Sequence, residues 1–260
     1  MASTILVKDV LWQVGVLMVD TDPQFYRFKE FDMVEFLSDG QEAICTILPT
    51  ACTRIDAIRL KAGTRQSIHT ILAADCLTAS GANPPGPIYG KQIIGGVMRN
   101  MGATGTTPGQ AVRLVERDVK DAANPNWHAA APGTVVREFV YDSSTPRDFY
   151  VSPPVPAGRL WVEFPYAASP RRITNTGTEG SPRYLRAGSA TDVLEVDDEW
   201  SDALKDYVCA RLHLTESKYT DRNKYPVHAA RFLAFLNAKT QAMTGKNPNL
   251  TVLPGVQPAP

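Results

Sequence analysis

The sequence predicts an α+β protein in which helices from both ends of the chain form a bundle. An antiparallel β subdomain is inserted between these helices, and an extended tail ends the chain. Three observations support this fold class: apolar residues recur at helical spacing near both ends, they alternate in the middle, and prolines recur after the last helix. The predicted parts are the N-terminal helices of the bundle (residues 1–52), the inserted β subdomain with long loops (53–192), the C-terminal helices of the bundle (193–245) and the extended tail (246–260).

The N-terminal part is predicted to contain two helices, over residues 5–19 and 30–48. The apolar residues of the first helix recur every three or four positions: Leu6, Val10, Val14, Leu17 and Met18. Gly40 is a weak point in the second, costing about 1 kcal/mol relative to alanine. Because the link between them is short and contains proline, the two helices are expected to pair as an antiparallel hairpin within a four-helix bundle.

The middle of the chain is predicted to be β-rich. Alternation from Arg54 onward indicates two short strands that turn at Ala62–Gly63. Residues 73–90 are rich in Gly, Pro, Ala and Ser, which is typical of an exposed loop, and the strand that follows is expected to bulge at Gly95–Gly96. The stretch "TTPGQAVRLVERDVKDAANPNW" predicts a short amphipathic helix or a turn, with three valines on one side: Val112, Val115 and Val119.

Three β-like runs, "TVVREFVYD", "RDFYVSPP" and "RLWVEFPYAA", follow at a spacing of about ten residues. Turn residues join them, so consecutive runs are expected to pair as an antiparallel meander. Residues 169–190 are polar and indicate a long loop. The meander would present a constant surface rather than a catalytic site.

The C-terminal part is predicted to contain two more helices. The first follows the acidic stretch "EVDDEW", because acids near a helix start complement the macrodipole. The second spans residues 221–243 and ends near Gly245. Several prolines in "NPNLTVLPGVQPAP" exclude a further helix and indicate an extended tail.

Composition excludes several classes of function. The chain carries 27 Lys and Arg against 27 Asp and Glu, interleaved, so no field would attract nucleic acid or an anionic membrane non-specifically. No apolar run reaches the ~18–20 residues of a membrane span, and the N terminus lacks a signal-peptide pattern. The four cysteines are expected to be reduced; a disulfide between Cys45 and Cys52 is possible, but two small buried hydrophobic side chains are the preferred interpretation.

No motif for catalysis, a cofactor or a metal is present. The sequence contains no P-loop, no HExxH and no GxSxG, and its four histidines are isolated from one another. The acidic cluster Glu195–Glu199 could hold a cation, but a solvated helix start explains it. The basic pair Arg171 and Arg172 either lies in a solvated loop or contacts an acidic neighbour or a phosphate.

Several phrases, in this order, resemble the head-to-tail connector (adaptor) proteins of tailed bacteriophages, especially of short-tailed phages. These phrases are "VKDVLWQVGVLMVD", "FLSDGQEAICTILP", "AGTRQSI", "VMRNMG", "TPGQAVRLVERDVKDAANPNWH", "YDSSTPRDFYVSPPVPAG", and "DALKDYVCARLHLTES" with "AARFLAFLNA". The resemblance covers about residues 4–240. It departs from the family pattern in the loops 73–90 and 169–190, which leaves open what these loops contact.

The resemblance implies a virion protein without catalytic activity, located at the head–tail junction and in the host cytoplasm during assembly. It implies a ring of about twelve copies, bound to the portal protein on one face and to the tail nozzle on the other. The genome would pass through its channel without sequence-specific binding. The ring is expected to use two different faces per subunit, and the chain alone to be monomeric or weakly associated until portal templates the ring.

The resemblance also suggests contacts for two segments. The C-terminal tail is expected to lie along the portal through Leu250, Val252, Leu253 and Val256, unless it is a disordered end. Arg171 and Arg172 are candidate contacts to a neighbouring subunit or to the tail. Two alternatives remain open: another neck or tail-completion protein, or an enzyme that uses His128 with Asp118 or Asp121.

Overall fold

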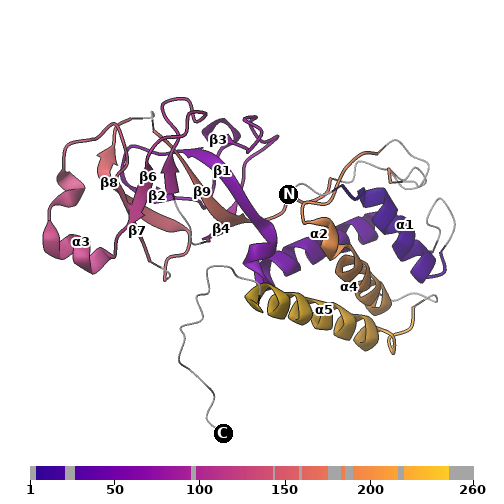
Figure 1. The fold of residues 1–260 in the computed structure, drawn as a ribbon. Coiled ribbons are helices and arrows are strands. Elements are labelled where there is room, and N and C mark those ends of the chain that lie inside the picture. Colours follow the sequence, from indigo (N-terminus) through magenta and orange to yellow (C-terminus); the bar gives the residue numbers. More distant parts are fainter. Residues whose placement is uncertain are drawn as a thin grey trace, which may run out of the picture. The chain divides into compact units, whose positions relative to one another are not determined.

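The computed structural model describes residues 4–20, 27–94, 98–142, 144–157, 160–174, 183–184, 190–215 and 220–245. The chain divides into two compact units, whose helices and strands are labelled in Figure 1. The sheet unit comprises Gln41–Arg172 and Glu195–Asp197. The helical unit comprises Thr4–Gly40, Ile173–Leu194 and the chain from Asp198 onward. Each unit is built from segments that are distant in sequence.

The sheet unit is organised around one sheet of nine strands. The strands are β1 Thr53–Arg59, β2 Gly63–Ser67, β3 Cys76–Leu77, β4 Gly90–Ile93, β5 Met98–Asn100, β6 Ala111–Leu114, β7 Glu138–Tyr141, β8 Asp148–Val155 and β9 Trp161–Ala168. Their order is β2-β8-β7-β6-β5-β9-β1-β3, and β4 also pairs with β9. The β6–β7 pair is parallel and the other pairs are antiparallel, so the sheet is mixed.

Strand β9 holds the sheet together. β1 pairs with β9 from Arg59↔Trp161 to Thr53↔Ala167, while β5 and β4 share the opposite edge of β9. The sheet also curls, because backbone bonds connect β4 with segments flanking β2 and β8: Gly90 N–H donates to the Ile68 carbonyl at 2.9 Å and Ile93 N–H donates to that of Pro146 at 3.1 Å. The result is a half-barrel with an apolar interior.

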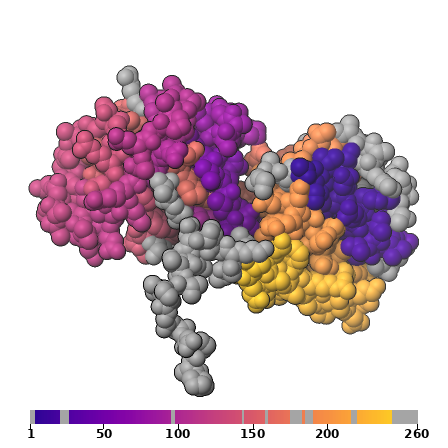
Figure 2. All heavy atoms as spheres, in the orientation of Figure 1, coloured from indigo at the N-terminus to yellow at the C-terminus, as the bar shows by residue number. Residues whose placement is uncertain are grey.

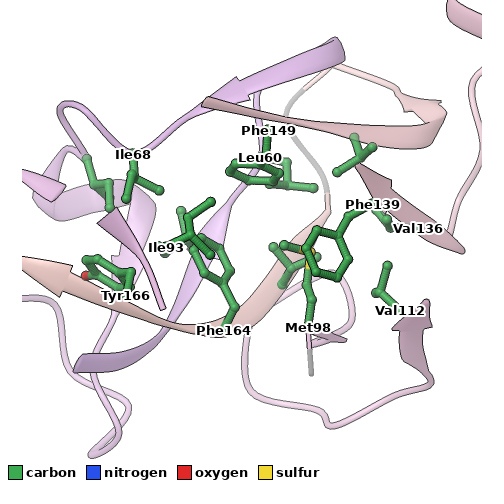
Figure 3. Packing of buried hydrophobic residues seen from close by; sticks show 14 of the residues in the cluster. Leu60, Ile68, Ile93, Met98, Val112, Val136, Phe139, Phe149, Phe164 and Tyr166 are labelled. Atoms are coloured by element: carbon green, nitrogen blue, oxygen red, sulfur yellow. The ribbon is translucent and has the colours of Figure 1, made fainter. Parts of the chain in front are cut away.

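That interior is filled by side chains from opposite strands (Figure 3). Phe164 lies between two aromatic neighbours, with ring centroids 5.5 Å from Phe149 and 5.7 Å from Tyr166. The buried Tyr166 hydroxyl donates to the Asp56 carboxylate at 2.7 Å, and Arg54 donates to the same carboxylate at 3.0 Å. Each buried polar group of this set therefore has a partner, as a stable core requires.

Five α-helices accompany the sheet in the described residues: α1 Val7–Leu17, α2 Glu30–Ile47, α3 Arg117–Ala123, α4 Ser201–Leu214 and α5 Tyr225–Gly245. In the helical unit, α4 packs against both α1 and α5. Gly40 of α2 faces α4, where a Cβ atom would lie 2.9 Å from Tyr207 and 3.0 Å from Leu204. The helix-weakening glycine is therefore explained by a close approach of two helices.

The predicted fold class is wrong. The structure is not a helical bundle with an inserted antiparallel β subdomain, but a half-barrel of mixed sheet with five helices. The predicted meander is wrong at its second step: β7 pairs with β8, but β9 pairs with β1, β4 and β5. The error has a physical reason, because spacing reports strand length and turns, whereas the β1–β9 pairing joins segments more than a hundred residues apart.

Three local expectations are corrected as well. Val112 lies in β6 rather than in a helix, and helix α3 begins only at Arg117. Cys45 and Cys52 form a disulfide at the end of α2, whereas Cys76 and Cys209 are free and buried. Leu17, placed by spacing on the buried stripe of the first helix, is 55% exposed.

Among the described residues, no helix has the length and apolarity needed to cross a membrane.

Candidate interaction surface on the helical unit

A groove of about 560 Å³ opens on the helical unit between helices α1, α4 and α5. Its lining residues are Trp12, Gln13, Val16 and Leu17 from α1, Asp202, Lys205 and Asp206 from α4, and His228 and Arg231 from α5. The atoms of α1 (indigo) and α5 (yellow) both reach the surface of this unit in Figure 2. We call this feature the α1/α4/α5 groove.

Helix α1 supplies the apolar wall of the groove at its C-terminal end. Its buried face consists of Val7, Val10, Leu11 and Val14, which follow helical spacing. Val16 and Leu17, in the last turn, are 48% and 55% exposed and line the groove. Leu17 lies seven residues after Val10 and therefore on the same face of the helix, but this end of the face is not covered. Exposed aliphatic side chains that line a groove are typical of a contact surface.

The end of α1 is held in an unusual conformation next to these residues. Val19 has a φ of 57°, in the left-handed region that β-branched residues rarely adopt, and it is 67% exposed. The helix ends there because Asp20 N–H donates to the Gly15 carbonyl at 2.7 Å. The buried Asp20 carboxylate in turn accepts bonds from the backbone N–H groups of Arg27 and Phe28, at 2.9 and 3.1 Å.

Most charges of the groove are neutralised inside it. Lys205 Nζ donates to Gln13 Oε1 at 2.6 Å and pairs with Asp202 at 2.5 Å. His228 Nδ1 lies 2.7 Å from Asp206 Oδ1. The His228 ring also stacks on His213, with centroids 5.6 Å apart. Burial, followed by the nearby His228 and Lys224, lowers the pKa of His213 below its usual value.

The residues of the groove offer a binding surface. The His228–Asp206 pair resembles the base and orienting acid of a catalytic site, but no serine, threonine or cysteine is among the nine lining residues. The described residues also contain no group of three or more His, Cys, Asp or Glu side chains that could hold a metal ion. What the groove offers a partner is apolar surface from α1 and one arginine.

The sequence-predicted site residues are distributed differently. Arg171 Nε donates to Glu195 Oε1 at 3.0 Å, so the basic cluster and the acidic cluster that were considered separately meet each other. Arg172 is exposed. The tail residues Leu250, Val252, Leu253 and Val256 lie outside the described residues.

The remaining acids of the predicted cluster also have structural partners. Asp198 accepts bonds from Thr4 N–H at 2.8 Å and from Ile5 N–H at 3.2 Å, which connects the start of α4 to the start of the chain. Glu199 pairs with Lys239 at 2.6 Å. Asp198 and Glu199 thus lie just before α4, as the sequence predicted, but both contact other segments rather than being only solvated.

Among the described contacts, no hydrogen bond joins His128 to Asp118 or Asp121, although His128 and Asp121 both contact Trp127. His128 Nδ1 lies 2.9 Å from the Thr64 hydroxyl, and its ring stacks on Trp127. Asp121 accepts a bond from Trp127 Nε1 at 2.7 Å and pairs with Arg117. Sequence reasoning missed the groove residues His228 and Asp206, because no spacing rule pairs residues on two packed helices.

A family model described as SU10 adaptor protein matches residues 7–251 of the chain, which includes both units and the groove. No curated protein matches the sequence.

Proposed function

The chain belongs to the SU10 adaptor protein family, and from this membership we propose that it forms the ring between portal and tail in a short-tailed phage. Membership makes the chain a phage adaptor protein with a structural role at the head–tail junction. The proposal goes further in three respects: a closed ring of about twelve copies, one face for the portal and one for the tail nozzle, and a central channel for the genome.

The observation that carries the proposal is the extent of the family match. It includes both compact units, so the whole described architecture, rather than one fragment, corresponds to an adaptor. Charge supports the channel function: with 27 basic and 27 acidic residues, the chain would not retard DNA through many phosphate contacts. The α1/α4/α5 groove offers a surface on the helical unit to which a partner could bind.

Contacts to other virion proteins are part of the same proposal. We infer that the tail from residue 246 onward binds the portal through Leu250, Val252, Leu253 and Val256, since an extended apolar segment loses little entropy on docking. Arg171 and Arg172 would face a neighbouring subunit or the tail, and Arg171 would then exchange its partner Glu195. The ring would assemble in the host cytoplasm.

Electron microscopy of the chain mixed with the portal protein of the same phage tests the proposal. We expect a ring-shaped species bound to portal, and a monomer or a weakly associated species when the chain is alone. A chain that never associates with portal or with itself would overturn the ring. A stable dodecamer without portal, measured by native mass spectrometry, would contradict templating. Deletion of residues 246–260 should weaken portal binding, and undiminished binding would remove the assigned role of the tail.

Two alternatives have distinct outcomes. Another neck or tail-completion protein would bind tail components but not portal. An enzyme that depends on His128 would lose its activity in the His128→Ala variant, and the contacts of His128 with Thr64 and Trp127 favour a structural role instead.

A further inference from the structure

We propose that the α1/α4/α5 groove of one copy binds the stretch Leu114–Val119 of a second copy. This inference rests on the proposed ring and identifies the two surfaces that would join neighbouring subunits. The stretch contains the end of β6 and the first turn of α3. We call it the β6/α3 segment.

The groove side needs an apolar partner. Val16 and Leu17 expose about half of their surface on its α1 wall, and Val227 on α5 is 49% exposed. Val227 lies four residues before Arg231, so the two occupy the same face of α5. The apolar lining of the groove therefore comes from α1, and Val227 adds exposed apolar surface on the face of α5 that carries Arg231.

The groove side also needs an anion. Its other ions are paired within the unit, but the Arg231 side chain has no partner among the described residues. Arg231 is exposed at the edge of the groove. A carboxylate from a partner would form an ion pair with Arg231. Such a charge at the rim of an interface determines orientation and selectivity more than affinity.

The β6/α3 segment offers both features. Leu114 and Val119 are 60% and 57% exposed. The side chains of Glu116 and Asp118, between them, have no partner in the described part of the chain. Arg117 is occupied by Asp121 and by the Tyr150 ring, so the segment presents a net negative charge. Its six residues span at most ~18 Å, short enough to act as one contact.

The two surfaces are complementary and different from each other. Each combines exposed aliphatic side chains with an uncompensated charge, positive at the groove and negative at the segment. An interface between two different surfaces is heterologous, and such contacts generate a ring when the rotation closes. A self-complementary groove would instead have produced a twofold dimer.

Cysteine cross-linking tests the contact directly. We would purify the variants Leu17→Cys and Val119→Cys separately, mix them with and without portal, and oxidise them. The native thiols would not interfere: Cys45 and Cys52 are bonded, and burial raises the pKa of Cys76 and of Cys209 to about 12. The control partner is Ile55→Cys, at a position of the sheet unit that is 54% exposed.

A cross-link between Leu17→Cys and Val119→Cys, at least about tenfold more than with Ile55→Cys, is the expected result. Equal cross-linking to both partners, or none with Val119→Cys, would overturn the inference.

Charge exchange provides the second measurement. Arg231→Glu and Asp118→Arg should each weaken self-association by about tenfold or less, since rim charges contribute modestly, and the double variant should recover most of the loss. Arg99→Glu, an exposed arginine outside both surfaces, is the matched control. Sedimentation velocity over a concentration series, repeated with portal, gives the association constants, and circular dichroism checks folding.

The outcomes separate the inference from the proposed function. If wild-type rings form and neither single variant changes them, the groove contact is wrong and the adaptor ring stands. If the single variants weaken assembly but the double variant does not recover it, the assigned pairing is wrong. If the wild-type chain does not self-associate with or without portal, both the inference and the ring fail.

Discussion

The two compact units of this chain both bury polar groups with fixed partners, such as Asp20 in the helical unit, but they differ in where their charges lie. The sheet unit buries polar groups with fixed partners, such as the Tyr166 hydroxyl on Asp56 and the Asn100 amide, which bonds both the N–H and the carbonyl of Val136. The helical unit places charges along an open groove, where Arg231 lacks a partner among the described residues. The difference indicates a sheet unit made rigid by its buried core, with acids in the β6/α3 segment of its surface that lack a partner in the described part of the chain, and a helical unit with an open groove for another molecule.

The comparison predicts that the largest loss of stability comes from the half-barrel core. Phe164→Ala removes a ring that is 2% exposed and contacts two aromatic neighbours, so we expect a loss of about 3–5 kcal/mol. Denaturant unfolding measures the loss, and hydrogen exchange should localise it to the sheet unit. In the matched variant Ile55→Ala, at a position that is 54% exposed, the loss should stay below about 0.5 kcal/mol.

The next effect concerns the buried polar set. Tyr166→Phe keeps the ring but removes the hydroxyl that donates to Asp56, so the carboxylate keeps only Arg54 of these two donors. We expect a loss of about 1–3 kcal/mol, because a buried acceptor loses a bond that water cannot replace. The control is Tyr89→Phe, at a tyrosine that is 52% exposed. Equal stability of Tyr166→Phe and wild type in thermal unfolding would show that this bond is not part of the rigid core.

The helical unit should contain a position at which a substitution raises the stability of the fold. Val19→Gly removes a β-branched side chain from the left-handed region and should raise stability by about 1 kcal/mol. Val16→Gly, in the same turn but inside the helix, should lower it by about 1 kcal/mol. The opposite signs in thermal unfolding identify backbone strain, whereas a loss in both variants would assign Val19 a stabilising contact.

The smallest expected effect is a different acid sensitivity of the two units. Because the pKa of His213 is lowered in the folded state, the unfolded chain binds more protons below about pH 6.5, and stability falls as pH decreases through that region. In the sheet unit, bonds from Ser144 and Arg65 lower the pKa of Asp142 and Asp148 below 3.8, so their contribution is lost only under stronger acid.

Hydrogen exchange at pH 5 and pH 7.5 tests this order. We expect α4 and α5 to lose protection at pH 5 while β8 does not. The His213→Gln variant should flatten the dependence and His69→Gln, in an exposed loop, should leave it unchanged. If β8 loses protection at pH 5 before α4 and α5 do, the greater acid sensitivity assigned to the helical unit is wrong.

Individual helices could be predicted from the sequence better than their partners could. The expected helices over 5–19 and 30–48 correspond to Val7–Leu17 and Glu30–Ile47, because helical periodicity is a property of neighbouring residues. The groove was not predicted, since Leu17 satisfies the same periodicity as the buried positions. Only packing showed that the last turn of α1 is left exposed, and only packing brought His228 to Asp206.

Most helices were predictable along the chain, because helical periodicity depends on residues within a few positions of one another, and the neutral charge and the order of phrases that resembles phage adaptors are properties of the whole sequence. The tertiary structure decided the parallel β6–β7 pair, the position of β9 between β1, β4 and β5, and the Cys45–Cys52 disulfide. Long-range pairing is selected by the summed burial of many side chains across the half-barrel, and this sum is not expressed in any one segment.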